Sequence, residues 1–141
     1  TIGHIALYVP KASLAFTADS LMALGCGRVF EGTMEQMWDS LCKLAALPPA
    51  TTVCSGHEYT ASNAKFALTV DPENRDLISR VADIETARSA GLPTVPSNLS
   101  TELKTNPFLR AADPGIRAHL GMQTANDAEV FAEVRKRKDN F

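Results

Sequence analysis

The chain has 141 residues, of which 45% are hydrophobic and 21% are charged, and its formal net charge is -2. This length suits one domain or slightly more, and the composition is that of an ordinary globular protein. The near-neutral charge argues against nucleic acid as a partner, and no apolar run is long enough to span a membrane. The 3 cysteines include no C-x-x-C pair, which favours a reducing, cytoplasmic location over a disulfide framework.

The first predicted element is a β-hairpin. Residues 5–9 and 14–17 are two apolar, strand-like runs separated by a short turn that contains proline. If the turn is centred midway between the runs, Leu7 pairs with Phe16, and the rest of the register follows from that pair. The hairpin would therefore bring residues before the first strand close to residues after the second.

Continuing this register places His4 directly opposite Asp19, and directly paired residues in an antiparallel ladder have close Cβ atoms. His57 lies just beyond another predicted strand, residues 51–54, at the end where sheet-based enzymes usually hold their chemistry. Two imidazoles and a carboxylate at one sheet edge suit zinc or iron, and a carboxylate can bridge two metals. A dinuclear site needs more donors than these, and we expect the others from outside this chain.

Between the hairpin and that strand, the sequence predicts a helix that begins at Thr33. Thr33 and Gln36 are three positions apart and form a capping-box pattern. Apolar residues at helical spacing then predict the buried stripe of this helix: Met34, Met37, Trp38, Leu41, Leu44 and Ala45.

After Tyr59 the pattern becomes helical. Residues 61–70 and 75–90 are predicted helices, and Asp113 followed by proline is typical of a helix start. A connector rich in proline and polar residues, 92–107, is expected to wind over the surface. A last helix runs close to the carboxyl terminus. The composition thus predicts an α+β fold in two parts.

With these residues in place, the chain resembles the carboxyl-terminal portion of glyoxalase II, the hydroxyacylglutathione hydrolase family of the metallo-β-lactamase superfamily. The resemblance covers nearly the whole chain and rests on TIGH, GCGR, FEGT, GHEYT, NPF and RKRKDNF. Ala18 stands where the family usually has glycine, and Ser20 where threonine is common. The larger departure is that the family's amino-terminal motif of clustered histidines and aspartate is absent from this chain.

The resemblance implies that residues 1–59 form the second half of a metallo-β-lactamase αββα sandwich and residues 60–141 an all-helical, glutathione-binding domain. It implies hydrolysis of S-D-lactoylglutathione to D-lactate and glutathione by a metal-bound hydroxide at a dinuclear site. The cofactors would be two divalent metal ions, with zinc preferred and iron or manganese as alternatives. Because only part of the site is present, we expect the isolated chain to be inactive without an amino-terminal half, in the same protein or in a complementing chain.

The same resemblance assigns roles to particular residues. His4 would bind one metal, Asp19 would bridge both as the catalytic carboxylate, and His57 would bind the other. Positions similar to the glutathione-binding residues of the family are Arg28, Tyr59, Arg135 and Lys138. Arginine can bind a carboxylate through two hydrogen bonds, while lysine acts as a compact charge.

Other interpretations stay open from the residues. The chain could belong to another metallo-β-lactamase-fold hydrolase or to a persulfide dioxygenase, although the dioxygenases lack the helical domain. It could also be a non-catalytic fragment that works only with a separate amino-terminal chain. The basic residues near the terminus could be a solvated helix end whose cations complement the helix dipole. Cys26 lies between two glycines and is paired with no base, so we interpret it as structural.

Overall fold

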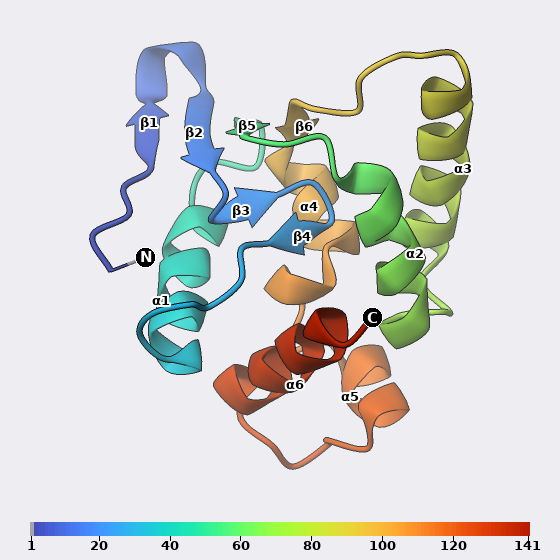
Figure 1. The fold of residues 1–141 in the computed structure, drawn as a ribbon. Coiled ribbons are helices and arrows are strands. Elements are labelled where there is room, and N and C mark those ends of the chain that lie inside the picture. The colour runs from blue at the N-terminus through green and yellow to red at the C-terminus, as the bar shows by residue number, and fades with distance from the viewer. Residues whose placement is uncertain (1) are drawn as a thin grey trace.

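The computed structural model of the chain describes residues 2–141 and shows a mixed α/β fold (Figure 1). The strands are β1 (Leu7–Val9), β2 (Leu14–Ala18), β3 (Leu21–Met22), β4 (Gly25–Cys26), β5 (Thr52–Ser55) and β6 (Ser97–Asn98). The α-helices are α1 (Met34–Ala45), α2 (Thr60–Val70), α3 (Arg75–Ser89), α4 (Leu99–Thr105), α5 (Pro114–Leu120) and α6 (Asp127–Asp139). Short 3₁₀ helices span Pro10–Ala12 and Pro107–Leu109.

The predicted hairpin register is confirmed. β1 and β2 pair antiparallel with Leu7 opposite Phe16, and they form one sheet in the order β1-β2-β5-β6. The turn between the two strands is a 3₁₀ helix that ends at Ser13 in the left-handed conformation, with φ 52°. β5 runs parallel to β2, so the carboxyl ends of these two strands meet at one edge of the sheet.

The extension of that ladder to His4 and Asp19 is wrong. Pairing stops at Leu7, two residues short of the expected start of the strand, and the register of β2 against β5 shifts between Phe16 and Ala18. Ala18 has a φ of 45°, which turns the chain out of the extended conformation just before Asp19. A regular ladder cannot continue through such an irregularity.

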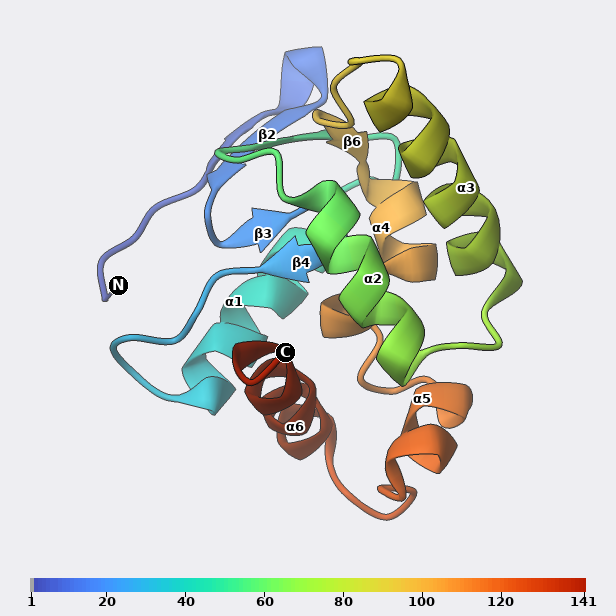
Figure 2. The same cartoon turned by 45° about the vertical axis from the view of Figure 1, so that its right-hand side comes forward.

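The helix predicted from Thr33 is confirmed, with both hydrogen bonds of the capping box. The Gln36 amide donates to the Thr33 hydroxyl at 3.2 Å, and the Thr33 amide donates to the Gln36 side chain at 2.9 Å. Leu41 is fully buried, and the partly buried apolar side chains of α1 pack against the same core. α1 packs on α6 and α2 packs on α3, as Figures 1 and 2 show.

The connector at residues 92–107 corrects a second expectation. Instead of only winding over the surface, this segment adds β6 to the sheet and forms α4, which Asn98 caps by accepting a hydrogen bond from the Ser100 amide at 2.9 Å. Glu102 and Asn106 are completely buried. The segment folds inward because these two polar side chains find partners on a distant hairpin, which no local sequence pattern reveals.

One large core joins the two parts of the chain. Its buried side chains include Leu21 and Val53 from the first part and Phe66, Phe108 and Phe131 from the second. β6, from the second part, pairs antiparallel with β5 from the first. Within residues 2–141, no helix has both the length and the apolar character needed to cross a membrane.

The first hairpin leaves one apolar face without cover. Side chains alternate across a strand, and here Ala15 and Thr17 point into the protein and are buried. On the opposite face, Leu7, Val9 and Phe16 are 59%, 41% and 45% exposed. Neighbouring exposed apolar side chains of this kind are typical of a surface that binds a partner, a ligand or another element of the same protein.

The buried carboxylate of Glu102 provides a test of this packing. Glu102→Ala removes the partner of the Arg80 guanidinium and of the Leu24 amide, and removing one member of a buried pair typically costs about 3–5 kcal/mol. We expect the free energy of unfolding, measured by urea denaturation, to fall by that amount or the variant to remain unfolded. Lys104→Ala, at an exposed position of the same helix, should change it by no more than about 0.5 kcal/mol. Equal stability of the two variants would contradict this account.

Candidate functional site

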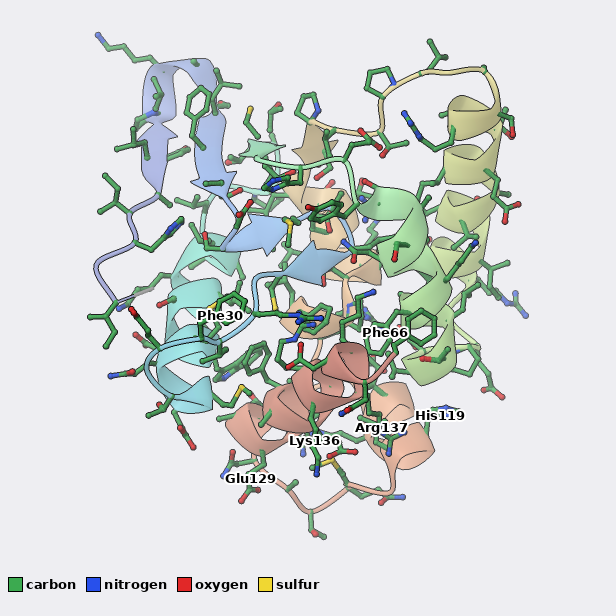
Figure 3. The ribbon with its side chains drawn as sticks, viewed as in Figure 1. Phe30, Phe66, His119, Glu129, Lys136 and Arg137 are labelled. Carbon is green, nitrogen blue, oxygen red and sulfur yellow. The ribbon has the colours of Figure 1, made fainter. Side chains whose placement is uncertain are left out.

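All seven residues singled out by the sequence line one cavity of about 1250 Å³. They come from the segments just before and just after the first hairpin, the loop after β4, the loop after β5, and α6: His4, Asp19, Arg28, His57, Tyr59, Arg135 and Lys138. The loop between β4 and α1 adds Phe30, which is 80% exposed and is labelled in Figure 3. The cavity therefore combines titratable groups with basic and aromatic side chains.

Asp19 and His57 are in direct contact, with Asp19 Oδ1 2.6 Å from His57 Nδ1. They meet because β2 and β5 are parallel neighbours and each residue follows the end of its strand. Gly56 makes the approach possible, since a Cβ at this position would lie 2.8 Å from Asp19 Oδ1. The Gly56 amide also donates to the Ala18 carbonyl at 3.0 Å, which ties the two strand ends together.

The Tyr59 ring stacks on the His57 ring. Its ring lies 4.8 Å from the His57 ring, centroid to centroid, with an interplanar angle of 7°. The tyrosine is 51% exposed and occupies the residue just before α2. Parallel stacking and the contact with Asp19 together restrict the orientation of the imidazole.

His4 stands apart from this pair. Its Nε2 lies 3.4 Å from the Thr17 carbonyl oxygen, and the residue is exposed. Across residues 2–141, no three His, Cys, Asp or Glu side chains are close enough together to hold a metal ion. The donor chemistry suits a divalent metal, and the described part of the chain gathers two of the three predicted ligands. His119, on α5, does not line this cavity (Figure 3). Its Nε2 instead lies 3.0 Å from the carbonyl oxygen of Thr69 on α2.

Arg135 is buried, a feature that sequence reasoning missed. It is only 3% exposed, and its guanidinium carbon lies 5.0 Å above the Phe108 ring. One terminal nitrogen donates to the Cys26 carbonyl at 2.9 Å, and the other donates to Asp139 at 2.9 Å. Nε has no hydrogen-bond partner among the described residues. Arg135 thus fastens the end of β4 to α6, in addition to lining the cavity.

Lys138 sits between two aromatic rings. Its Nζ lies 5.3 Å from the Phe66 centroid and 5.1 Å from the Phe141 centroid. Burial lowers the pKa of Lys138, and the positive charges of Arg135 and Arg28 lower it further. An anion entering the cavity would relieve this mutual repulsion of cations.

Asp139 is the second residue that sequence reasoning missed. Its Oδ1 lies 3.4 Å from Arg28 Nε and 2.9 Å from an Arg135 terminal nitrogen. The only available signal is the four-residue spacing from Arg135, which is typical of a helical ion pair. Arg28 keeps a side chain that is 59% exposed, so it remains open to the cavity.

Cys26 behaves as the structural residue that the sequence indicates. It is 3% exposed, and burial raises the pKa of its thiol to about 12, although the neighbouring Arg135 opposes the shift. A thiol with this pKa is protonated at neutral pH and is a poor nucleophile.

A family model and individual relatives both match this chain, and both carry the same family description. A family described as "Hydroxyacylglutathione hydrolase C-terminus" matches residues 58–141. Proteins named hydroxyacylglutathione hydrolase are 71% identical in Roseobacter denitrificans, 67% in Ruegeria pomeroyi and 60% in Mesorhizobium japonicum, each over all 141 residues. The match covers 100% of this chain and 55% of each relative. The chain therefore spans about half the length of the curated relatives it matches.

Thiol reactivity tests the environment of Cys26. In the native chain at pH 8, we expect iodoacetamide to label the exposed Cys42 while Cys26 stays unmodified, because the Cys26 thiol is both buried and protonated. Peptide mass spectrometry at successive times gives the two rates. In denaturant the rates should become similar. If Cys26 is labelled in the native chain as fast as Cys42, its assignment as a closed structural residue is wrong.

Proposed function

The chain belongs to the hydroxyacylglutathione hydrolase family, and we propose that it is the substrate-binding and partial metal-binding portion of a thioester hydrolase. The proposed reaction converts S-D-lactoylglutathione to D-lactate and glutathione. The observation that supports it best is that one cavity is lined both by the Asp19–His57 pair and by basic side chains that include Arg28, Arg135 and Lys138. The Asp19–His57 pair would provide metal-binding groups, and the basic side chains would provide positive charge for the carboxylates of glutathione.

We propose that His4, Asp19 and His57 contribute ligands for two divalent metal ions, with Asp19 bridging them. Zinc is the preferred ion, with iron or manganese as alternatives, since imidazole and carboxylate donors suit all three. Divalent ions in such sites act as Lewis acids and lower the pKa of water. The remaining donors would come from a preceding segment or a complementing chain, since residues 2–141 bring no third donor to Asp19 and His57.

The residues of this chain would orient the partners of the reaction. Hydrolysis adds water to the thioester carbonyl carbon, breaks the carbon–sulfur bond, and leaves the sulfur as a glutathione thiol once it gains a proton. Asp19 and Tyr59 fix the His57 ring from its edge and its face, so little reorganisation is needed at this centre.

We propose that the basic side chains bind the glutathione part of the substrate. Glutathione carries two carboxylates, and Arg28 and Lys138 present their charges to the cavity. Arg135 adds positive charge, but its terminal nitrogens already bond to Cys26 and Asp139. Its contribution would therefore be to hold the two sides of the site together as much as to contact substrate.

The proposal also covers the domain organisation. Residues 1–59 would be the second half of a metallo-β-lactamase αββα sandwich, and 60–141 the helical glutathione-binding domain. The exposed apolar face of Leu7, Val9 and Phe16 supports a missing layer over the first hairpin. The part of the relatives that this chain does not cover would supply that layer. The alternative, a non-catalytic fragment that works only with a separate amino-terminal chain, shares this surface.

A chimera tests the proposal directly. The amino-terminal segment of the Roseobacter denitrificans relative, up to the matched region, is joined to this chain, and release of glutathione thiol from S-D-lactoylglutathione is measured. We expect activity and bound metal in the chimera and neither in the isolated chain, because the isolated chain lacks ligands and a covered sheet. A folded, metal-loaded chimera without thioesterase activity would overturn the proposed function. Activity in the isolated chain would contradict the partial site.

Within the active chimera, Lys138→Ala tests substrate binding. Loss of the ammonium should raise KM for the glutathione thioester about tenfold with little change in kcat, since a binding interaction worth roughly 1.4 kcal/mol is removed. Lys136→Ala is the matched control, because Lys136 lies on the same helix but does not line this cavity (Figure 3). A loss confined to kcat would contradict a binding role for Lys138.

A further inference from the structure

Three successive residues after β5 alternate in direction. His57 and Tyr59 line the cavity, whereas the intervening Glu58 does not. The Glu58 carboxylate instead reaches the segment between α3 and β6, which passes close to the path from β5 to α2 (Figures 1 and 2). Glu58 therefore points away from the cavity, although its two neighbours in the sequence, His57 and Tyr59, line it.

Thr94 holds the Glu58 carboxylate on both of its oxygens. The Thr94 amide lies 3.3 Å from Oε1 and 3.1 Å from Oε2, and the Thr94 hydroxyl donates to Oε1. Arg88 adds a longer ion pair, with Nε 4.0 Å from Oε1. Hydrogen bonds to an ionised acceptor are about twice as strong as those between neutral groups. The contact joins positions that are 36 residues apart in the chain.

The Thr94 side of this contact is itself anchored. Arg88, in the last turn of α3, donates to the Leu92 carbonyl at 2.8 Å, and the Leu92 amide donates to the Ala87 carbonyl at 2.8 Å. α3 is fixed in turn by its buried Leu77 and Ile84. The carboxylate of Glu58 is therefore bound to a segment that is tied to a packed helix.

The loop from Gly56 to Tyr59 has few other restraints. Apart from the Gly56 amide bond to Ala18, its described hydrogen bonds are the His57–Asp19 contact and the Glu58 contacts, before the Tyr59 carbonyl begins the hydrogen bonding of α2. The side chains of His57 and Tyr59 stack on each other, and the backbone of Tyr59 joins this stack to the start of α2 but not to α3. Glu58 supplies that second reference point.

We propose that Glu58, clamped by Thr94, is a positioning residue that sets the placement of the His57–Tyr59 stack in the cavity. This inference rests on the proposed function for its effect on catalysis, and on the structure alone for its effect on the stack. When the clamp is broken, the loop gains freedom, so His57 and Tyr59 spend less time in the working arrangement. Both the reaction step and substrate binding should then weaken.

The kinetic test uses the chimera with Thr94→Val, which keeps the shape and the backbone amide but removes the hydroxyl, and with Glu58→Gln, which removes the charge. We expect kcat/KM to fall about tenfold in each, with kcat reduced and KM raised. Thr94→Ser, which restores the hydroxyl, should return kcat/KM to within about twofold of the parent. Thr86→Val is the control, because the Thr86 hydroxyl bonds only to the Ala82 carbonyl of its own helix. The double variant Glu58→Gln, Thr94→Val should lose no more than the worse single variant.

A second readout does not depend on activity. The chain has 2 tyrosines, Tyr8 and Tyr59, so ring-labelled tyrosine gives two sets of NMR signals, and only Tyr59 lies in the stack. In Thr94→Val of the isolated chain, we expect the Tyr59 ring signals to move toward those of unstructured tyrosine while the Tyr8 signals stay in place. Thr94→Ser and Thr86→Val should leave both unchanged.

These outcomes separate the two proposals. If the folded, metal-loaded parent chimera is inactive but Thr94→Val loosens Tyr59, the clamp stands and the hydrolase proposal fails. If Thr94→Val keeps its fold, its Tyr59 signals and its kcat/KM, the clamp is overturned whatever the activity of the parent. Equal losses in Thr94→Val and Thr94→Ser, or parallel shifts of Tyr8 and Tyr59, would show a general loss of structure and would also overturn it.

Discussion

A carboxylate without access to water holds the β3–β4 hairpin against the helices. Glu102 on α4 accepts a hydrogen bond from the Leu24 amide at 2.9 Å and another from Asn106 at 3.1 Å, and it pairs with Arg80 on α3. Asn106 also donates to the carbonyls of Met22 and Gly25. Because an ionised group in the interior is tolerated only when it is paired and hydrogen bonded, the hairpin and the two helices must keep their relative positions. Leu24, with a φ of 54°, is stabilised in an unfavourable conformation by the same network.

The β3–β4 hairpin determines the positions of residues on two sides of the cavity. Asp19 lies just before it and Arg28 just after it, so the hairpin sets where the carboxylate and the guanidinium leave the sheet. The two ends touch: a Cβ on Gly27 would be 2.6 Å from the Asp19 carbonyl oxygen. The Gly27 amide also reaches the Ser20 carbonyl at 3.4 Å. The network centred on Glu102, which does not itself line the cavity, thus helps to set the distance between Asp19 and Arg28.

Local sequence patterns predicted the helices and strands of the first part of the chain. The features that were not predicted depend on partners that are distant in the sequence. The register of Leu7 with Phe16 and the capping box at Thr33 follow from spacing alone, and both are confirmed. The strand ends also indicated which side chains would reach one cavity. The inward fold of the connector was missed because Glu102 looks like any exposed helical glutamate until the amide of Leu24 is beside it. Thr94 was missed for the same reason, since Glu58 is 36 residues away. Asp139 was missed although its pair with Arg135 is local, because the second partner, Arg28, comes from a distant loop.

The shared core has a consequence for how this architecture can be rearranged. Phe108 and Phe131 pack in the same cluster as Leu21, Leu41 and Val53, and β6 completes the sheet beside β5. The helical region therefore cannot be separated from the first part of the chain without exposing the shared core. If it were joined to another protein, it would carry only part of this core and one strand, β6, of the sheet. A working exchange would have to include the β3–β4 hairpin, α1 and β5 together with the helices, so the segment that folds as a unit is larger than the helical region alone.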